Sequence, residues 1–264
     1  MTTVITNLSF SKSNAGKWNK VVANHATLLT LLHKNKQSKR NKFHFMITNT
    51  SETVDLLIGN SPLTQTSSSS LLGFVVNDRL TPTDHVSKLL KKVATNTRLL
   101  LAVRHLMNSH LSLKFYHHFI HSYLTYGSEI YFPLATSKQT TSLTILQKKA
   151  LKYALSLPRR YPTRLLEHKS VLLLPKLACY FSAILGYKVL NNSCPSYLSD
   201  LFKTTPSTST IITRHTFKLP NSYYHSTLQK YTLTSFNNLP KSLRSAKSLK
   251  TFKKNLKTYL RNDN

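Results

Sequence analysis

Residues 81–101 constrain the fold of this chain more than any other segment, because they read as one long amphipathic helix. Thr81 is suited to cap the helix, Pro82 to occupy its first position, and Asp84 follows three residues after the cap. Apolar residues and one threonine then repeat at the spacing of a single helix face: Val86, Leu89, Leu90, Val93, Ala94, Thr97, Leu100 and Leu101. The opposite face carries four bases: Lys88, Lys91, Lys92 and Arg98. One side is therefore expected to pack in a core, and the other to meet solvent or a polyanion.

The remaining patterns predict a mostly α-helical chain with a small N-terminal antiparallel β-sheet, an α+β fold. Apolar periodicity indicates further helices at residues 18–32, 109–127, 137–155, 176–190, 197–202 and 248–260. Alternating apolar residues indicate strands at 43–48, 54–58 and 71–76, the first two being partners. The serines at 67–70 are expected to form a connector between strands.

The charge is strongly basic: 37 Lys and Arg stand against 8 Asp and Glu, a net charge of +29. This excess runs through every part of a chain that also has 13 Tyr and 12 Phe, so it favours a long contact with nucleic acid. No apolar run approaches the length of a membrane span, and the first residues do not match a signal peptide. We therefore expect an intracellular protein, cytoplasmic or nuclear, with no membrane partner.

Several kinds of site are not expected. Cys179 and Cys194 fall in different predicted segments and give no disulfide framework. His117 and His121 are four residues apart on a predicted helix, but that helix has no carboxylate or cysteine to complete a metal site. The sequence has neither a Gly-x-Ser-x-Gly turn nor a Gly-x-x-x-x-Gly-Lys phosphate loop. We expect no metal, no cofactor and no hydrolase chemistry.

Four motifs occur in a fixed order along the chain. Leu71–Leu80 reads LLGFVVNDRL and leads directly into the long helix. The second motif consists of Tyr116, Ser122, Leu124, Tyr126 and Gly127. Leu146–Leu151 reads LQKKAL, and the last motif joins Phe236–Pro240, FNNLP, to the helix after it. Together they resemble the region that follows the catalytic palm in reverse transcriptases of non-LTR retrotransposons, of the LINE-type, jockey-like kind.

The resemblance implies three parts. These are a residual palm edge with a primer-grip hairpin over residues 1–80, a helical thumb over 81–157, and a helical, basic region over 158–264. Leu72, Gly73 and Phe74 would form the primer grip, and Lys88, Lys91, Lys92 and Arg98 would follow the backbone of the nucleic acid. Three further bases, Arg159, Arg160 and Arg164, could equally bind phosphate or keep a loop solvated.

Polymerases of this family hold two metal ions between closely set carboxylates, which include an adjacent aspartate pair. The acidic residues of this chain include no adjacent pair: Glu52, Asp55, Asp78, Asp84, Glu129, Glu167, Asp200 and Asp263. We therefore expect a truncated RNA-directed DNA polymerase that begins after the catalytic motif, has no catalytic residue of its own, and binds RNA, DNA or an RNA–DNA duplex. An upstream polymerase fragment could supply the palm. A stand-alone basic nucleic-acid-binding protein and a non-functional remnant open reading frame are the alternatives.

Overall fold

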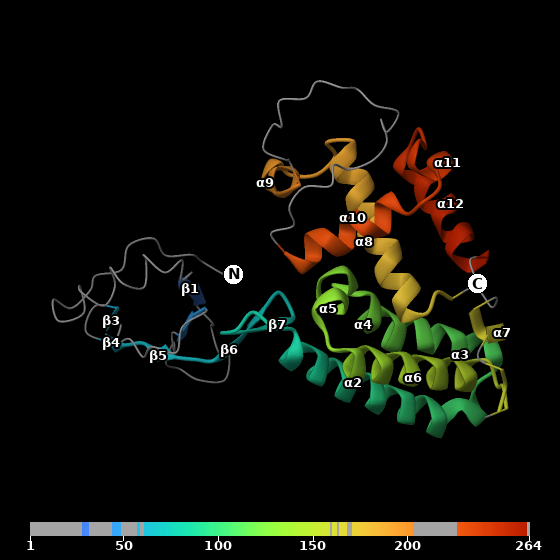
Figure 1. The fold of residues 1–264 in the computed structure, drawn as a ribbon. Helices are drawn as coiled ribbons and strands as arrows, with labels where there is room; N and C mark the ends of the chain where they lie inside the picture. Colours follow the sequence, from blue (N-terminus) through green and yellow to red (C-terminus); the bar gives the residue numbers. More distant parts are fainter. Residues whose placement is uncertain are drawn as a thin grey trace. The chain divides into compact units, whose positions relative to one another are not determined.

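The computed structural model of the 264-residue chain describes residues 28–31, 44–48, 57–58, 61–158, 160–162, 164–167, 171–202 and 226–262. The chain divides into two compact units, residues 1–87 and 88–264. The predicted fold class is confirmed, since the described residues are mostly helical and the strands are few and short (Figure 1). The second unit contains most of the predicted thumb and all of the predicted C-terminal region.

The first unit contains a three-stranded sheet. Strand β2 (His44–Ile47) lies between β1 (Leu28–Leu31), which is antiparallel to it, and β5 (Thr64–Gln65), which is parallel. The helix predicted for residues 18–32 is wrong at 28–31, which pair with β2; residues 18–27 lie outside the described residues. A short apolar run fits a helix or a buried strand equally well, and here pairing with a distant segment decides between them.

Two other strand predictions need correction. Strand β3 (Leu57–Ile58) pairs with β4 (Ser61–Pro62). The prediction that this segment pairs with the strand at 43–48 is therefore wrong. The expected connector at 67–70 is largely strand, because β6 (Ser68–Leu71) forms an antiparallel hairpin with β7 (Phe74–Asn77). Short strands of this kind depend on the partner for their hydrogen bonds, and the local pattern does not name that partner.

The predicted long helix is confirmed as α2 (Thr83–Val103), which starts in the first unit and continues in the second. It begins two residues after the predicted cap. The Asn77 amide group donates to Thr81 Oγ1 over 2.8 Å, and the Thr81 backbone N–H donates to Asn77 Oδ1 over 2.8 Å. Thr81 therefore belongs to the turn that precedes the helix. The predicted apolar face is buried at five positions: Val86, Leu89, Val93, Thr97 and Leu100.

Apart from turns and loops, the described residues of the second unit form only helices. After α2 come η2 (Arg104–Leu106), α3 (Ser109–Tyr116), the single π-helical turn η3 (His117–His121) and α4 (Ser122–Thr125). Next are α5 (Ser128–Leu134), α6 (Ser137–Ala154), α7 (Arg164–Glu167) and α8 (Leu174–Leu190). The last are α9 (Ser196–Leu201), α10 (Thr227–Asn237), α11 (Lys241–Arg244) and α12 (Leu249–Asn262). Four of these helices were not predicted: α5, α7, α10 and α11.

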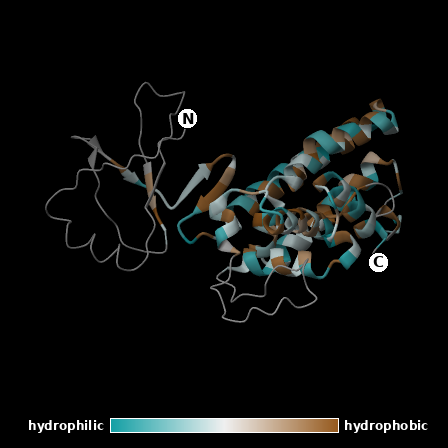
Figure 2. Cartoon of the chain, turned by 90° about the horizontal axis from the view of Figure 1, so that it is seen from above, coloured by the Kyte–Doolittle hydropathy of each residue, from teal (hydrophilic) through white to brown (hydrophobic). Residues whose placement is uncertain are grey.

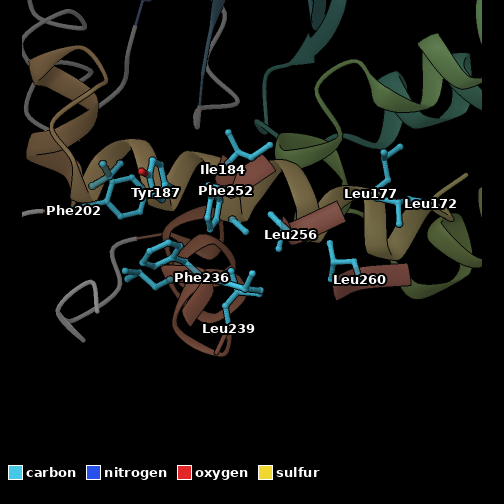
Figure 3. Packing of buried hydrophobic residues seen from close by; sticks show 14 residues of the cluster. Leu172, Leu177, Ile184, Tyr187, Phe202, Phe236, Leu239, Phe252, Leu256 and Leu260 are labelled. Atoms are coloured by element: carbon cyan, nitrogen blue, oxygen red, sulfur yellow. The ribbon is translucent and has the colours of Figure 1, made fainter. Parts of the chain in front are cut away.

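The core of the second unit forms around α8, which contacts α5, α6, α10 and α12 (Figure 1). Figure 2 shows hydrophobic and hydrophilic residues alternating along these helices, as amphipathic packing requires. In the main apolar cluster, the ring of Tyr187 stacks on Phe252 with centroids 4.4 Å apart (Figure 3). At Gly186, a Cβ atom would lie 2.7 Å from Cβ of Phe236. Helices α8 and α10 therefore approach closely at a position that only glycine fits.

A buried glutamine joins three segments of the second unit. The side-chain amide of Gln147 on α6 donates to the Tyr116 hydroxyl over 3.2 Å and to the Leu172 carbonyl over 3.1 Å. Its Oε1 accepts from the Leu174 backbone N–H over 2.7 Å. Gln147 thereby links α3, α6 and the start of α8, and its buried polar atoms are well satisfied. Burial raises the pKa of Tyr116, so the hydroxyl stays neutral.

Candidate nucleic-acid interface

The hairpin tip of the first unit exposes an apolar residue in an unfavourable conformation. Leu72 and Gly73 form the two-residue turn between β6 and β7, with φ values of 49° and 85°. Positive φ is ordinary for glycine and unfavourable for leucine, and such turns favour asparagine or aspartate at the first position. The Leu72 side chain is 81% exposed, so packing does not explain its presence. The strand predicted for residues 71–76 is therefore interrupted by this turn.

Phe74, the third predicted grip residue, has a different environment. Its ring stacks on His85 of α2, with centroids 3.8 Å apart and planes 16° apart. The backbone N–H of Val75 donates to Nδ1 of His85 over 3.3 Å, so the neutral ring carries its proton on Nε2. Phe74 therefore fixes the hairpin to the start of α2, while Leu72 and Gly73 form its exposed tip.

The four predicted bases of α2 do not have equal roles. Lys88, Lys91 and Arg98 are exposed and lie on the side of the helix opposite its buried face. None of the three forms an ion pair with a carboxylate of the described residues. They are consequently free to contact phosphate oxygens.

Lys92 lies on the flank of α2, where its ammonium sits 4.3 Å from the centroid of the Tyr123 ring. This cation–π contact attaches α2 to α4. On the same side of α2, the Asn96 amide donates to the carbonyl of Phe119 over 2.6 Å. A π-helical turn such as η3 leaves a carbonyl available for such a bond. Lys92 is thus partly committed to packing, unlike the other three bases.

The predicted bases near residue 160 are only partly described. Arg160 is exposed in the turn that follows α6, where the Tyr161 N–H donates to the Pro158 carbonyl over 3.0 Å. Arg159 lies outside the described residues. Arg164 is the first residue of α7, and its side chain is likewise not described. The two readings of this loop, phosphate contact or solvation, stay open.

Two histidines of η3, His117 and His121, have lowered pKa values. His117 and His121 lie edge to face, with ring centroids 5.4 Å apart. Burial, followed by the charges of His117 and Lys257, lowers the pKa of His121 to about 4. Burial, His118 and Lys257 also lower the pKa of His117. His121 therefore takes up a proton only in more acidic solution than an exposed histidine does.

A second group of exposed bases lies on α12, outside the predicted site. Lys250, Lys253, Lys254 and Lys257 are all exposed, and none pairs with a described carboxylate. The resemblance implies backbone contacts for the bases of α2 and none for these lysines. The spacing of the lysines along α12 was the feature of the sequence that could have predicted a second basic surface.

Some of the motif residues that carry the resemblance belong to the core of the second unit. Tyr116, Leu124, Gln147 and Phe236 are fully buried. The Tyr131 hydroxyl donates to the Leu124 carbonyl over 2.6 Å, which adds to the links made by Gln147. Packing is therefore a sufficient reason for these residue types, and the resemblance bears on the fold of the second unit more than on its chemistry.

Among the described residues, no three His, Cys, Asp or Glu side chains lie close enough to hold a metal ion. Nor does that part of the chain contain a helix with the length and apolar character needed to cross a membrane. Comparisons of the chain with family models, with curated proteins and with solved structures find no match.

Proposed function

We propose that this chain binds nucleic acid through phosphate contacts. The observation that carries the proposal is the exposed side of α2, where Lys88, Lys91 and Arg98 have no carboxylate partner among the described residues. Three bases at helical spacing on one face suit contact with successive phosphates. The net charge of +29 adds a long-range attraction between the chain and the negatively charged nucleic acid.

Within this function, the resemblance favours a truncated reverse transcriptase of a non-LTR retrotransposon. The hairpin tip supports this choice, because an exposed leucine at positive φ suggests a functional use for the side chain. Leu72 and Gly73 would contact the primer end, and Phe74 would hold the hairpin. The chain would bind RNA, DNA or an RNA–DNA duplex, with a palm supplied by another fragment. The alternative, a stand-alone basic nucleic-acid-binding protein, needs only the charge.

The test is binding of purified protein to three ligands: a recessed RNA–DNA primer–template, a blunt duplex and a single strand. Each is titrated across a salt series, with the K88Q/K91Q/R98Q variant beside the wild type. The slope of log K against log salt is negative, and each phosphate contact contributes about −0.9 to it. We therefore expect the slope of the variant to be less negative than that of the wild type by about 2 to 3. An unchanged slope would exclude α2 as the contact surface.

The choice of ligand separates the two candidates. A preference for the recessed end that persists at high salt supports the reverse-transcriptase fragment. Equal binding to all three ligands, lost as salt rises, supports the stand-alone binding protein. Absence of binding at low salt would refute both.

A further inference from the structure

Helix α12 separates its exposed residues by charge. At 3.6 residues per turn, its five bases fall within a sector of about 100° along one flank: Lys250, Lys253, Lys254, Lys257 and Arg261. The other exposed flank carries only uncharged polar residues: Thr251, Asn255, Thr258 and Asn262. Lysines that served only to solvate the helix would have no reason to avoid this second flank. The segregation of charge indicates that the basic flank, and not the other flank, contacts a partner.

Lys257 of the basic flank lies within electrostatic range of the π-helical turn. After burial and a neighbouring histidine, its charge lowers the pKa of both His117 and His121. Like charges gathered in one place repel one another, and no described carboxylate pairs with Lys250, Lys253 or Lys257 to offset this. A bound anion would relieve the repulsion.

The opposite side of α12 is already occupied. Phe252, Leu256 and Leu260 are buried in the apolar cluster, where they face α8 and α10 (Figure 3). A basic amphipathic helix can bind an anionic membrane by inserting its apolar face, but this face is not available in the folded unit. The exposed charge is therefore suited to a partner that presents anions on its outside, as a nucleic acid does.

We propose that the basic flank of α12 is a second phosphate-binding surface, which contacts the backbone of a nucleic acid duplex. The inference rests on the proposed nucleic-acid binding and assigns to it a surface other than α2. Lys250 to Lys257 spans seven residues, about 10 Å along the helix axis. This length matches about three phosphates of one strand, which rise about 3.4 Å each along a duplex.

The decisive variant moves charge without removing it. In K254N/N255K/K257T/T258K, two lysines pass from the basic flank to the uncharged flank, and the composition and net charge are unchanged. All four positions are exposed, so the fold should be preserved. Far-UV circular dichroism and the urea midpoint verify this. A second variant removes four exposed lysines elsewhere in the unit, K138Q/K149Q/K230Q/K241Q, and measures the effect of net charge alone.

Binding to a 25-base-pair duplex is measured across a salt series for the wild type and both variants. We expect the slope of log K against log salt to be less negative by about 2 in the relocated variant, which should also bind about tenfold more weakly near 0.1 M salt. The variant with scattered substitutions should change the slope by less than about 1. Equal behaviour of wild type and relocated variant would overturn the inference, since binding would then depend on net charge and not on this flank.

Two further results would also overturn it. Wild-type binding to vesicles of anionic phospholipid that is lost in the relocated variant, while duplex binding is unchanged, would assign the flank to a membrane surface. Loss of affinity in the K88Q/K91Q/R98Q variant with none in the relocated variant would leave the proposed function intact and remove only this inference. If the wild type binds no nucleic acid, the proposed function itself fails.

Discussion

At the scale of single residues, Gly186 is a position with no room for a larger side chain. In an open helix, replacing glycine by alanine stabilises by about 1 kcal/mol. Here the added Cβ would lie 2.7 Å from Cβ and 2.9 Å from Cγ of Phe236, between two packed helices. We expect Gly186→Ala to destabilise the chain by about 1 to 3 kcal/mol, as overpacking does.

The sign of the change makes the measurement decisive. Urea unfolding of wild type and Gly186→Ala gives the two free energies of unfolding at the same pH. A more stable variant would show that α8 and α10 are not in contact at this position.

His121 should make stability depend on pH. Its pKa is about 4 in the folded chain and about 6.5 when unfolded, so the unfolded state takes up the proton first as pH falls. The neutral side chain is fully compatible with folding above pH 6.5, and stability falls between pH 6.5 and 4. We expect a loss of about 3 kcal/mol over this range from His121.

The variant His121→Phe isolates this contribution. Nδ1 of His121 has no hydrogen-bond partner among the described residues, so the phenyl ring sacrifices no bond at that atom. Urea midpoints at several pH values should fall less steeply in the variant than in the wild type. Parallel pH profiles would mean that His121 is protonated as readily in the folded chain as in the unfolded one.

At the scale of elements, the β6–β7 hairpin separates stability from function. Asparagine adopts positive φ more readily than leucine and is favoured before glycine in this type of turn. We expect Leu72→Asn to leave the fold at least as stable, because the 81% exposed leucine contributes little packing. The same variant should reduce the preference for a recessed primer end.

Thermal unfolding and the binding ratio of recessed to blunt duplex test the two halves of this prediction. Gly73→Val serves as the comparison, since it disturbs the turn at φ 85° and should destabilise the hairpin. Retention of the recessed-end preference in Leu72→Asn would argue against a grip at the tip.

At the scale of the whole molecule, the distribution of acids limits the chemistry. No two of its 8 acidic residues are adjacent in sequence, and two-metal phosphoryl chemistry needs closely set carboxylates. We expect the purified chain to extend no primer on an RNA template with either Mg²⁺ or Mn²⁺. Incorporation of labelled nucleotide above the background of a heat-treated sample would contradict this prediction.

The sequence alone determined the long helices, because their signals are local. The apolar repeat of 81–101 and the run from Ser137 predicted α2 and α6, whose apolar faces lie within the same segment. At the start of α6, Thr136 and Gln139 form a reciprocal capping box from residues that are only three positions apart. The basic face of α2 followed from the same periodicity.

The tertiary structure decided what depends on distant partners. Residues 28–31 became a strand because β2, more than ten residues further along the chain, supplies their hydrogen bonds. The bonds of Gln147 to Leu172 and Leu174, the contact of Gly186 with Phe236, and the low pKa of His121 each join residues far apart in sequence or depend on burial. A local pattern contains no information on which distant group completes a contact, so these features emerge only when the chain is packed.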